Sequence, residues 1–209
     1  METTRILCFG DSLTWGFDPA TRTRLPEDVR WPGVLQSLLG EGYRVIEEAQ
    51  SGRTIATEDP AEGEKNGLRY VIPCLESQSP LDLMIVMLGG NDLKRKFGYA
   101  SIDIAGEMQI LLEKIQSYNR FRMGDKMKVL LMAPPVIGEE VSDPWLEDCF
   151  DFPGPGRSPG SWRAGMSSWR RCTTVSTWTP PRWSGPAPST GSIWRPRAMP
   201  VWPGLFIRS

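Results

Sequence analysis

Residues 81–92 read LDLMIVMLGGND, and this stretch decides the fold of the chain. Its apolar side chains follow one another with almost no polar alternation, which is typical of a strand buried on both faces of a parallel sheet. The run stops abruptly at two glycines, and Asn91 and Asp92 follow. We therefore predict a buried parallel strand whose carboxyl end carries a polar loop.

Three further apolar runs predict strands, and two of them also lead into small polar loops. Residues 5–9 stop at Gly10, and residues 43–47 are followed by the turn at 51–54. The third run, residues 128–133, is ended by two prolines. Each strand that precedes a polar loop brings small, turn-forming residues to its carboxyl end.

Two segments have the apolar spacing of an amphipathic helix, residues 28–39 and 102–118. Residues 55–70 are polar without a clear period and predict a loop, with a short helix near 68–75. Strands that alternate with helices at this spacing predict an α/β fold with a doubly wound, mostly parallel sheet. In such a sheet, functional residues collect at the carboxyl ends of the strands.

Three polar groups are expected at this edge: the Ser12 hydroxyl, the backbone amide of Gly52 and the carboxamide of Asn91. Taken singly, each loop is also an ordinary turn, because Gly, Asp, Asn and Ser are common turn residues. Together they form a nucleophile with donors for an oxyanion. We expect Asp11 to shape the turn before Ser12 and Asp92 to support its loop, because an exposed carboxylate with a pKa of about 4 is a weak base for serine.

The chain resembles the SGNH, or GDSL, hydrolase family, and within it the bacterial arylesterase and acyltransferase branch. The resemblance is carried by residues 8–16 (CFGDSLTWG), 30–35 (RWPGVL), 45–48 (VIEE) and 87–92 (MLGGND), and it covers roughly residues 4–150. It implies a three-layer, flavodoxin-like form of the doubly wound parallel sheet. It also implies a serine ester hydrolase or acyltransferase that acts on small acyl or aryl esters.

The same resemblance implies a role for individual residues. Ser12 would be the nucleophile, and the backbone N–H groups of Ser12 and Gly52 with the side-chain amide of Asn91 would form the oxyanion hole. Trp15 follows the nucleophile closely, so we expect it to line the acyl pocket; a plain core position is the alternative.

The 209-residue sequence contains no histidine, although a serine nucleophile needs a general base to take its proton. The family's fourth block, an Asp-x-x-His near the C-terminus, has no match here. We therefore expect the chain as written to be catalytically impaired. A non-catalytic carbohydrate- or ester-binding relic of the fold is the alternative.

Residues 153–209 differ in composition from residues 1–152, which we interpret as the hydrolase core. The segment holds six of nine tryptophans, ten of nineteen prolines and eight arginines, but no Asp, Glu or Lys. Frequent proline disfavours helices and central strands, so we predict a disordered or irregular tail. It could be a nucleic-acid-binding tail, a disordered linker, or a wrong-frame translation.

The third explanation is favoured, because the codons of residues 189–194 read from their third base allow Asp-Gly-Val-His-Leu. That sequence is a form of the missing block, at about the position where the family carries it. A tail that never allows the chain to fold is a further possibility.

Bulk properties set the remaining expectations. The formal net charge is −1, the arginines of the tail are scattered and the core is acidic, so we expect no nucleic-acid partner.

No apolar run reaches the roughly 18–20 residues of a membrane span, and no signal peptide is recognisable, which favours a cytoplasmic protein without membrane contact. The four cysteines lack metal-ligand spacing, so we predict reduced thiols, no metal and no cofactor. The expected partner is a small-molecule ester, and the resemblance leaves a homo-oligomer open.

Overall fold

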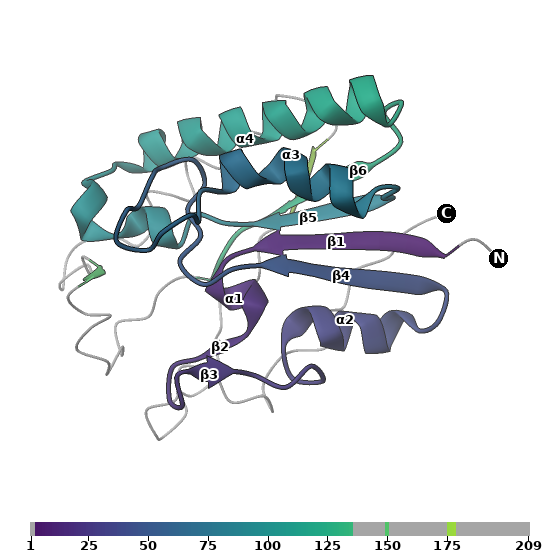
Figure 1. Cartoon of the computed structure of the whole chain (residues 1–209), viewed down its shortest axis with the longest axis horizontal. Coiled ribbons are helices and arrows are strands. Elements are labelled where there is room, and N and C mark those ends of the chain that lie inside the picture. The colour runs from purple at the N-terminus through teal and green to yellow at the C-terminus, as the bar shows by residue number, and fades with distance from the viewer. Residues whose placement is uncertain (1–2, 136–148, 151–174, 179–209) are drawn as a thin grey trace.

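The fold is a five-stranded parallel sheet between two layers of helices, seen here in a computed structural model that describes residues 3–135, 149–150 and 175–178. The strands lie in the order β4-β1-β5-β6-β7, and every neighbouring pair is parallel. This is the flavodoxin-like order, and it confirms the predicted α/β class (Figure 1). The strand bounds are β1 Thr4–Gly10, β4 Tyr43–Ala49, β5 Leu83–Met87, β6 Lys128–Met132 and β7 Val175–Trp178.

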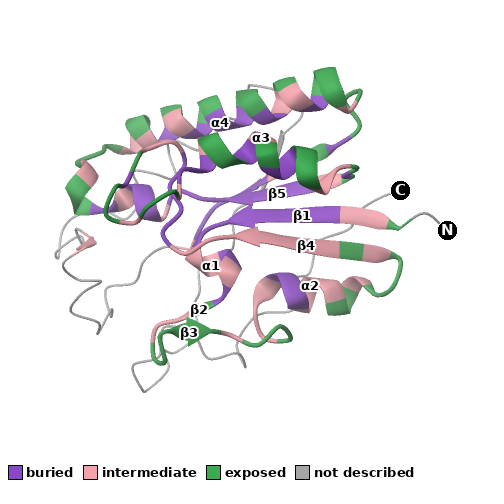
Figure 2. Cartoon of the chain, viewed as in Figure 1, coloured by how far each residue is buried: buried purple, intermediate pink, exposed green. Residues whose placement is uncertain are grey.

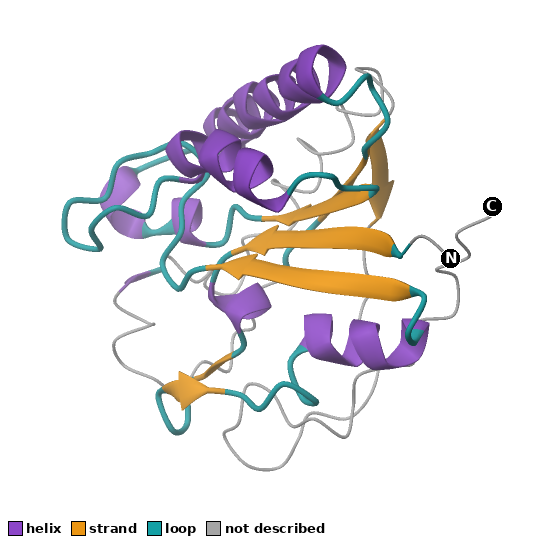
Figure 3. Ribbon diagram, turned by 45° about the vertical axis from the view of Figure 1, so that its right-hand side comes forward, coloured by secondary structure: helices purple, strands orange, loops and turns teal. Residues whose placement is uncertain are grey.

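Helices cover both faces of the sheet, as Figures 1 and 3 show. Helix α2 (Trp31–Leu39) lies on one face, and α3 (Gly67–Gln78) and α4 (Ser101–Arg122) lie on the other. Strand β1 contributes side chains to the apolar clusters on both faces of the sheet, because successive side chains of a strand point to opposite faces. Leu7 and Phe9 belong to one cluster, and Ile6 and Cys8 belong to the other. The central strands are therefore buried on both sides, as their unbroken apolar sequence predicted (Figure 2).

The pairing register brings the carboxyl ends of three strands together. Gly10 at the end of β1 pairs with Ala49 at the end of β4 and with Met87 at the end of β5. The loops that follow these strands hold short elements: α1 Ser12–Trp15, the hairpin of β2 Phe17–Asp18 and β3 Thr23–Arg24, and the 3-10 turns η1 Asn91–Leu93 and η2 Arg95–Phe97. All the predicted site residues follow these three strand ends.

Several predicted boundaries shift, each for a local reason. Helix α2 begins at Trp31 rather than at 28, because Pro26 O accepts hydrogen bonds from Val29 N and Arg30 N in a separate turn. Helix α3 begins inside the predicted loop, where the Asn66 side chain accepts from the Arg69 N–H at 3.1 Å and caps it. Strand β5 spans fewer residues than the apolar run around it.

Strand β7 differs from the expectation that residues 153–209 have no ordered fold. Val175–Trp178 pair in parallel with β6, and this stretch is rich in β-branched and aromatic residues and free of proline. The rest of the segment lies outside the described residues, and so does the position 189–194 at which the shifted frame allows a histidine.

Among the residues that the structure describes, no helix is long and apolar enough to cross a membrane. Nor do three or more Asp, Glu or Cys side chains of this part gather where they could hold a metal ion. Cys8, Cys74 and Cys149 are free thiols, and burial raises the pKa of Cys74 to about 12 and that of Cys8 further still. Cys172 lies outside the described residues.

Candidate active site

Ser12 stands at the start of α1, directly after the end of β1. Asp11 caps this short helix, and its Oδ1 accepts a hydrogen bond from Leu13 N at 3.0 Å. The close turn requires a small residue before it, because a Cβ on Gly10 would lie 2.0 Å from Thr14 Oγ1. The Asp11 side chain thus caps the turn, and Ser12 is left partly exposed at the edge of the sheet.

Gly52 lies in the turn after β4 and is buried. Its φ of 85° is in the left-handed region, and a Cβ there would lie 2.6 Å from Glu62 Oε2 and 3.2 Å from Lys65 Nζ. The backbone conformation therefore favours glycine, whereas the flexible ends of Glu62 and Lys65 would have to shift to admit a side chain.

Asn91 and Asp92 tie the loop after β5 to the turn that contains Gly52. Asn91 Nδ2 donates to the backbone oxygen of Arg53 at 3.1 Å, and Asp92 Oδ1 accepts from Ile55 N at 2.9 Å. Asp92 therefore supports the neighbouring turn rather than only its own loop. The structure brings the Ser12, Gly52 and Asn91 loops to one edge; their roles as nucleophile and oxyanion donors stay predictions.

Arg53 is a site residue to which the sequence assigned no role. It is only 3% exposed, and its Nη1 donates to Gly10 O at 3.0 Å and to Glu48 O at 2.6 Å. Its guanidinium lies 4.5 Å from the ring centroid of Phe9 and 5.1 Å from that of Tyr70. The Arg53 side chain thus joins the ends of β1 and β4, and its backbone oxygen accepts the hydrogen bond from Asn91. A single cation directly after a turn glycine was the only sign of it in the sequence.

The expectation that Asp11 and Asp92 are exposed carboxylates with ordinary pKa values is wrong. Asp11 is 1% exposed, and burial raises its pKa to about 6 against the opposing effects of the Leu13 hydrogen bond and the Arg53 charge. Asp92 is fully buried, and burial together with the nearby Glu107 carboxyl raises its pKa. Within the described residues, no hydrogen bond joins either carboxyl to the Ser12 hydroxyl.

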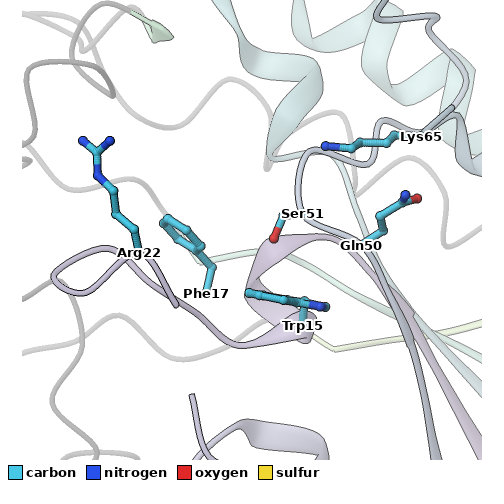
Figure 4. A pocket seen from close by; sticks show the side chains of 6 residues that line it. All are labelled: Trp15, Phe17, Arg22, Gln50, Ser51 and Lys65. Atoms are coloured by element: carbon cyan, nitrogen blue, oxygen red, sulfur yellow. The ribbon is translucent and has the colours of Figure 1, made fainter. Parts of the chain in front are cut away.

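A cavity of about 360 Å³ opens between the segment that follows Ser12 and the turn that precedes Gly52. Trp15 lines this cavity, and its role in an acyl pocket stays a prediction. Its ring also contacts Arg24, whose guanidinium carbon lies 5.1 Å from the ring centroid. Figure 4 shows the six lining side chains: Trp15, Phe17, Arg22, Gln50, Ser51 and Lys65.

Two carboxylates near this cavity are each shared by two cations. Glu47 Oε2 lies 2.7 Å from Arg24 Nη2 and 2.6 Å from Arg30 Nε. Glu62 lies between two lysines, and their hydrogen bonds lower its pKa. Each group of three side chains carries one net positive charge.

Comparison with known proteins places this geometry among ester hydrolases. The model of the GDSL-like lipase/acylhydrolase family matches residues 8–169. An aryl esterase from M. smegmatis is 36% identical with a TM-score of 0.76, over 85% of this chain and 84% of that chain, in both its inhibitor-bound and its native structure. A carbohydrate acetylesterase from Sinorhizobium meliloti is 34% identical with a TM-score of 0.71, over the same shares. A search of curated proteins found no significant match.

Replacing Arg53 with methionine should lower the free energy of unfolding by about 2–4 kcal/mol, because two buried carbonyl groups lose a charged donor. Urea unfolding followed by circular dichroism measures this. The matched control is Arg44→Met, on the exposed side of β4, which should change stability by less than about 0.5 kcal/mol. Equal midpoints for the two variants would contradict the bridging role of Arg53.

Asp11 should make the fold less stable as the pH rises. Its raised pKa means that the folded state holds a proton that the unfolded state releases, so its contribution is present below about pH 4 and is lost as the pH passes about 6. The free energy of unfolding should therefore fall relative to Asp11→Asn by up to about 3 kcal/mol between pH 4 and 7. Asparagine keeps the helix cap.

Urea titrations at several pH values compare the two proteins, with the exposed Asp28→Asn as the control. Parallel curves for the native chain and Asp11→Asn would show that Asp11 does not titrate in this range.

Proposed function

The chain belongs to the GDSL-like lipase/acylhydrolase family, and we propose that it is a serine esterase for small acyl or aryl esters with Ser12 as its nucleophile. Family membership makes it a carboxylic ester hydrolase by class, and the similar structures are an aryl esterase and a carbohydrate acetylesterase. Acyl transfer to an alcohol instead of water is part of the same proposal, since both reactions use the same acyl-enzyme.

The observation that carries the proposal is the meeting of three loops at the carboxyl edge of the sheet. Ser12 begins α1 after β1, Gly52 follows β4, and Asn91 begins η1 after β5. Arg53 and Asp92 join these loops by hydrogen bonds, which supports the proposal that the donors are held in place before substrate arrives. Preorganised donors of this kind stabilise charge that develops in the transition state.

In the proposed reaction, Ser12 Oγ attacks the ester carbonyl carbon while its proton passes to a base. The carbonyl oxygen takes the negative charge and accepts hydrogen bonds from Ser12 N–H, Gly52 N–H and Asn91 Nδ2. Collapse of this intermediate expels the alcohol and leaves an acyl-enzyme, which water or a second alcohol then releases.

The base is the part that the sequence lacks. Asp11 and Asp92 have raised pKa values, but their observed partners are Leu13 N and Ile55 N rather than the serine hydroxyl. We propose that residues from near 153 onward are a wrong-frame translation of a segment that carries Asp-x-x-His. Sequencing the gene across codons 145–209 tests this, and an unshifted frame without a neighbouring histidine codon would favour the binding-relic alternative.

The 209-residue chain should hydrolyse p-nitrophenyl acetate at a negligible rate, because loss of the histidine from a serine triad costs about 10⁶ in turnover. A chain translated in the alternative frame after residue 152 should be faster by at least about 10³, and Ser12→Ala should abolish the gain.

Spectrophotometric release of p-nitrophenol measures all three proteins. An inactive restored chain would contradict the esterase proposal, and Ser12-dependent turnover by the present chain would contradict the need for a histidine.

We also propose a cytoplasmic protein whose partner is a small ester rather than nucleic acid or membrane. The exclusion of nucleic acid and membrane rests on composition, whereas the ester partner and the possible homo-oligomer rest on the family resemblance.

A further inference from the structure

We propose that the cavity beside α1 selects esters whose aromatic part carries a carboxylate, and that Lys65 recognises this charge. The inference rests on the proposed function, because the cavity serves selection only if Ser12 is the reacting group. It goes further in naming the chemistry of the substrate.

The lining of the cavity combines aromatic rings with positive charge. Of its six described lining residues, Trp15 and Phe17 are aromatic, Arg22 and Lys65 are cationic, and none is acidic. Figure 4 shows Lys65 extending its ammonium group toward the space above Ser51 and Trp15, with Phe17 on the far side. A planar ring bound in this cavity would therefore be lined by aromatic side chains and by the Lys65 ammonium group.

Lys65 keeps an available charge although it forms an ion pair. Glu62 is shared, with Oε2 at 2.9 Å from Lys65 Nζ and Oε1 at 3.1 Å from Lys94 Nζ. Two lysines on one carboxylate leave one net positive charge. The Lys94 side chain is only 5% exposed, whereas that of Lys65 is 24% exposed and lines the cavity, so Lys65 is the member that a ligand can reach.

The position of Lys65 also limits where the substrate charge can lie. Lys65 Nζ lies 3.2 Å, and its partner Glu62 Oε2 lies 2.6 Å, from the place that a Cβ on Gly52 would occupy, and the Gly52 N–H is a proposed oxyanion donor. The recognised carboxylate must therefore lie close to the reacting ester, which fits a carboxylate and an ester on one ring. A distant charge at the end of a long acyl chain would not reach it.

The local charge is opposite in sign to that of the surrounding domain. Residues 1–152 contain all 25 acidic residues of the chain and only 16 of its 24 basic residues, yet Arg24–Glu47–Arg30 and Lys65–Glu62–Lys94 each place a net positive charge beside the site. A positive site on an acidic body attracts anions to one place and repels them elsewhere. This pattern favours a specific anionic ligand over general anion binding.

The test is a binding comparison that needs no turnover. We would titrate the full chain with 4-fluorobenzoate and with its neutral analogue 4-fluorobenzamide, and follow both by ¹⁹F NMR at low salt. Benzoate should bind at least about fivefold more tightly, as expected for one partly screened charge pair at close range, and the ratio should fall as salt is added.

The variants assign this preference to one residue. Lys65→Gln should reduce the affinity ratio of benzoate to benzamide to near one, and Lys65→Arg should keep most of it. The matched control, Lys126→Gln, removes an exposed lysine that precedes β6, and should leave the ratio unchanged. Trp15→Ala should weaken both probes alike.

Equal binding of the two probes, no binding of either, or an equal effect of Lys65→Gln and Lys126→Gln would overturn the proposal. Ser12→Ala should leave the ratio intact, since the serine takes no part in recognising the charge. A preserved ratio in a restored chain that fails to hydrolyse esters would contradict the proposed esterase alone.

Discussion

The buried guanidinium of Arg53 is the interaction on which the geometry of the site depends. Parallel strands end at one edge of a sheet, but the loops beyond them are free to diverge unless something holds them. Arg53 Nη1 bonds the last residue of β1 and a carbonyl of β4, while the Arg53 carbonyl accepts from Asn91 beyond β5. One residue therefore relates three strand ends. Transferring a charge from water into the protein interior is costly, and here hydrogen bonds to two carbonyl groups and contacts with two aromatic rings offset that cost.

The pKa values of Asp11 and Asp92 follow from the same packing. Loops drawn together over the end of the sheet exclude water from both carboxyl groups, so burial is the first cause of each raised pKa. The positive charge of Arg53 opposes this at Asp11, whereas the Glu107 carboxyl adds to it at Asp92. The two residues that border the site are thus structural acids whose protonation is linked to the loops they hold.

The fold was predictable because its signal is local. The apolar runs at β1, β5 and β6 and the periodicity of α4 are repeated patterns, and the alternation of strands and helices predicts that the strands are parallel. The loops of Ser12, Gly52 and Asn91 were also predictable, since each comes directly after a strand.

The roles of Arg53, Glu62 and Lys65 were not predictable, because they depend on residues distant in sequence. Arg53 donates a hydrogen bond to Gly10 O, and Glu62 forms an ion pair with Lys94. The buried state of Asp11 and strand β7 depend in the same way on tertiary packing.

The arrangement separates substrate binding from proton transfer along the chain. The proposed nucleophile, the proposed oxyanion donors, the residues that position them and the lining of the cavity all lie between residues 8 and 94, within elements that pack on β1, β4 and β5. The base is the one component that the family supplies from the C-terminal segment, where this sequence has no histidine. The hydrogen bonds described above between the three loops join residues that all lie between 10 and 92. The proposed oxyanion donors and the proposed base therefore come from different parts of the chain, and we expect loss of the base to affect proton transfer rather than the contacts that hold the donors.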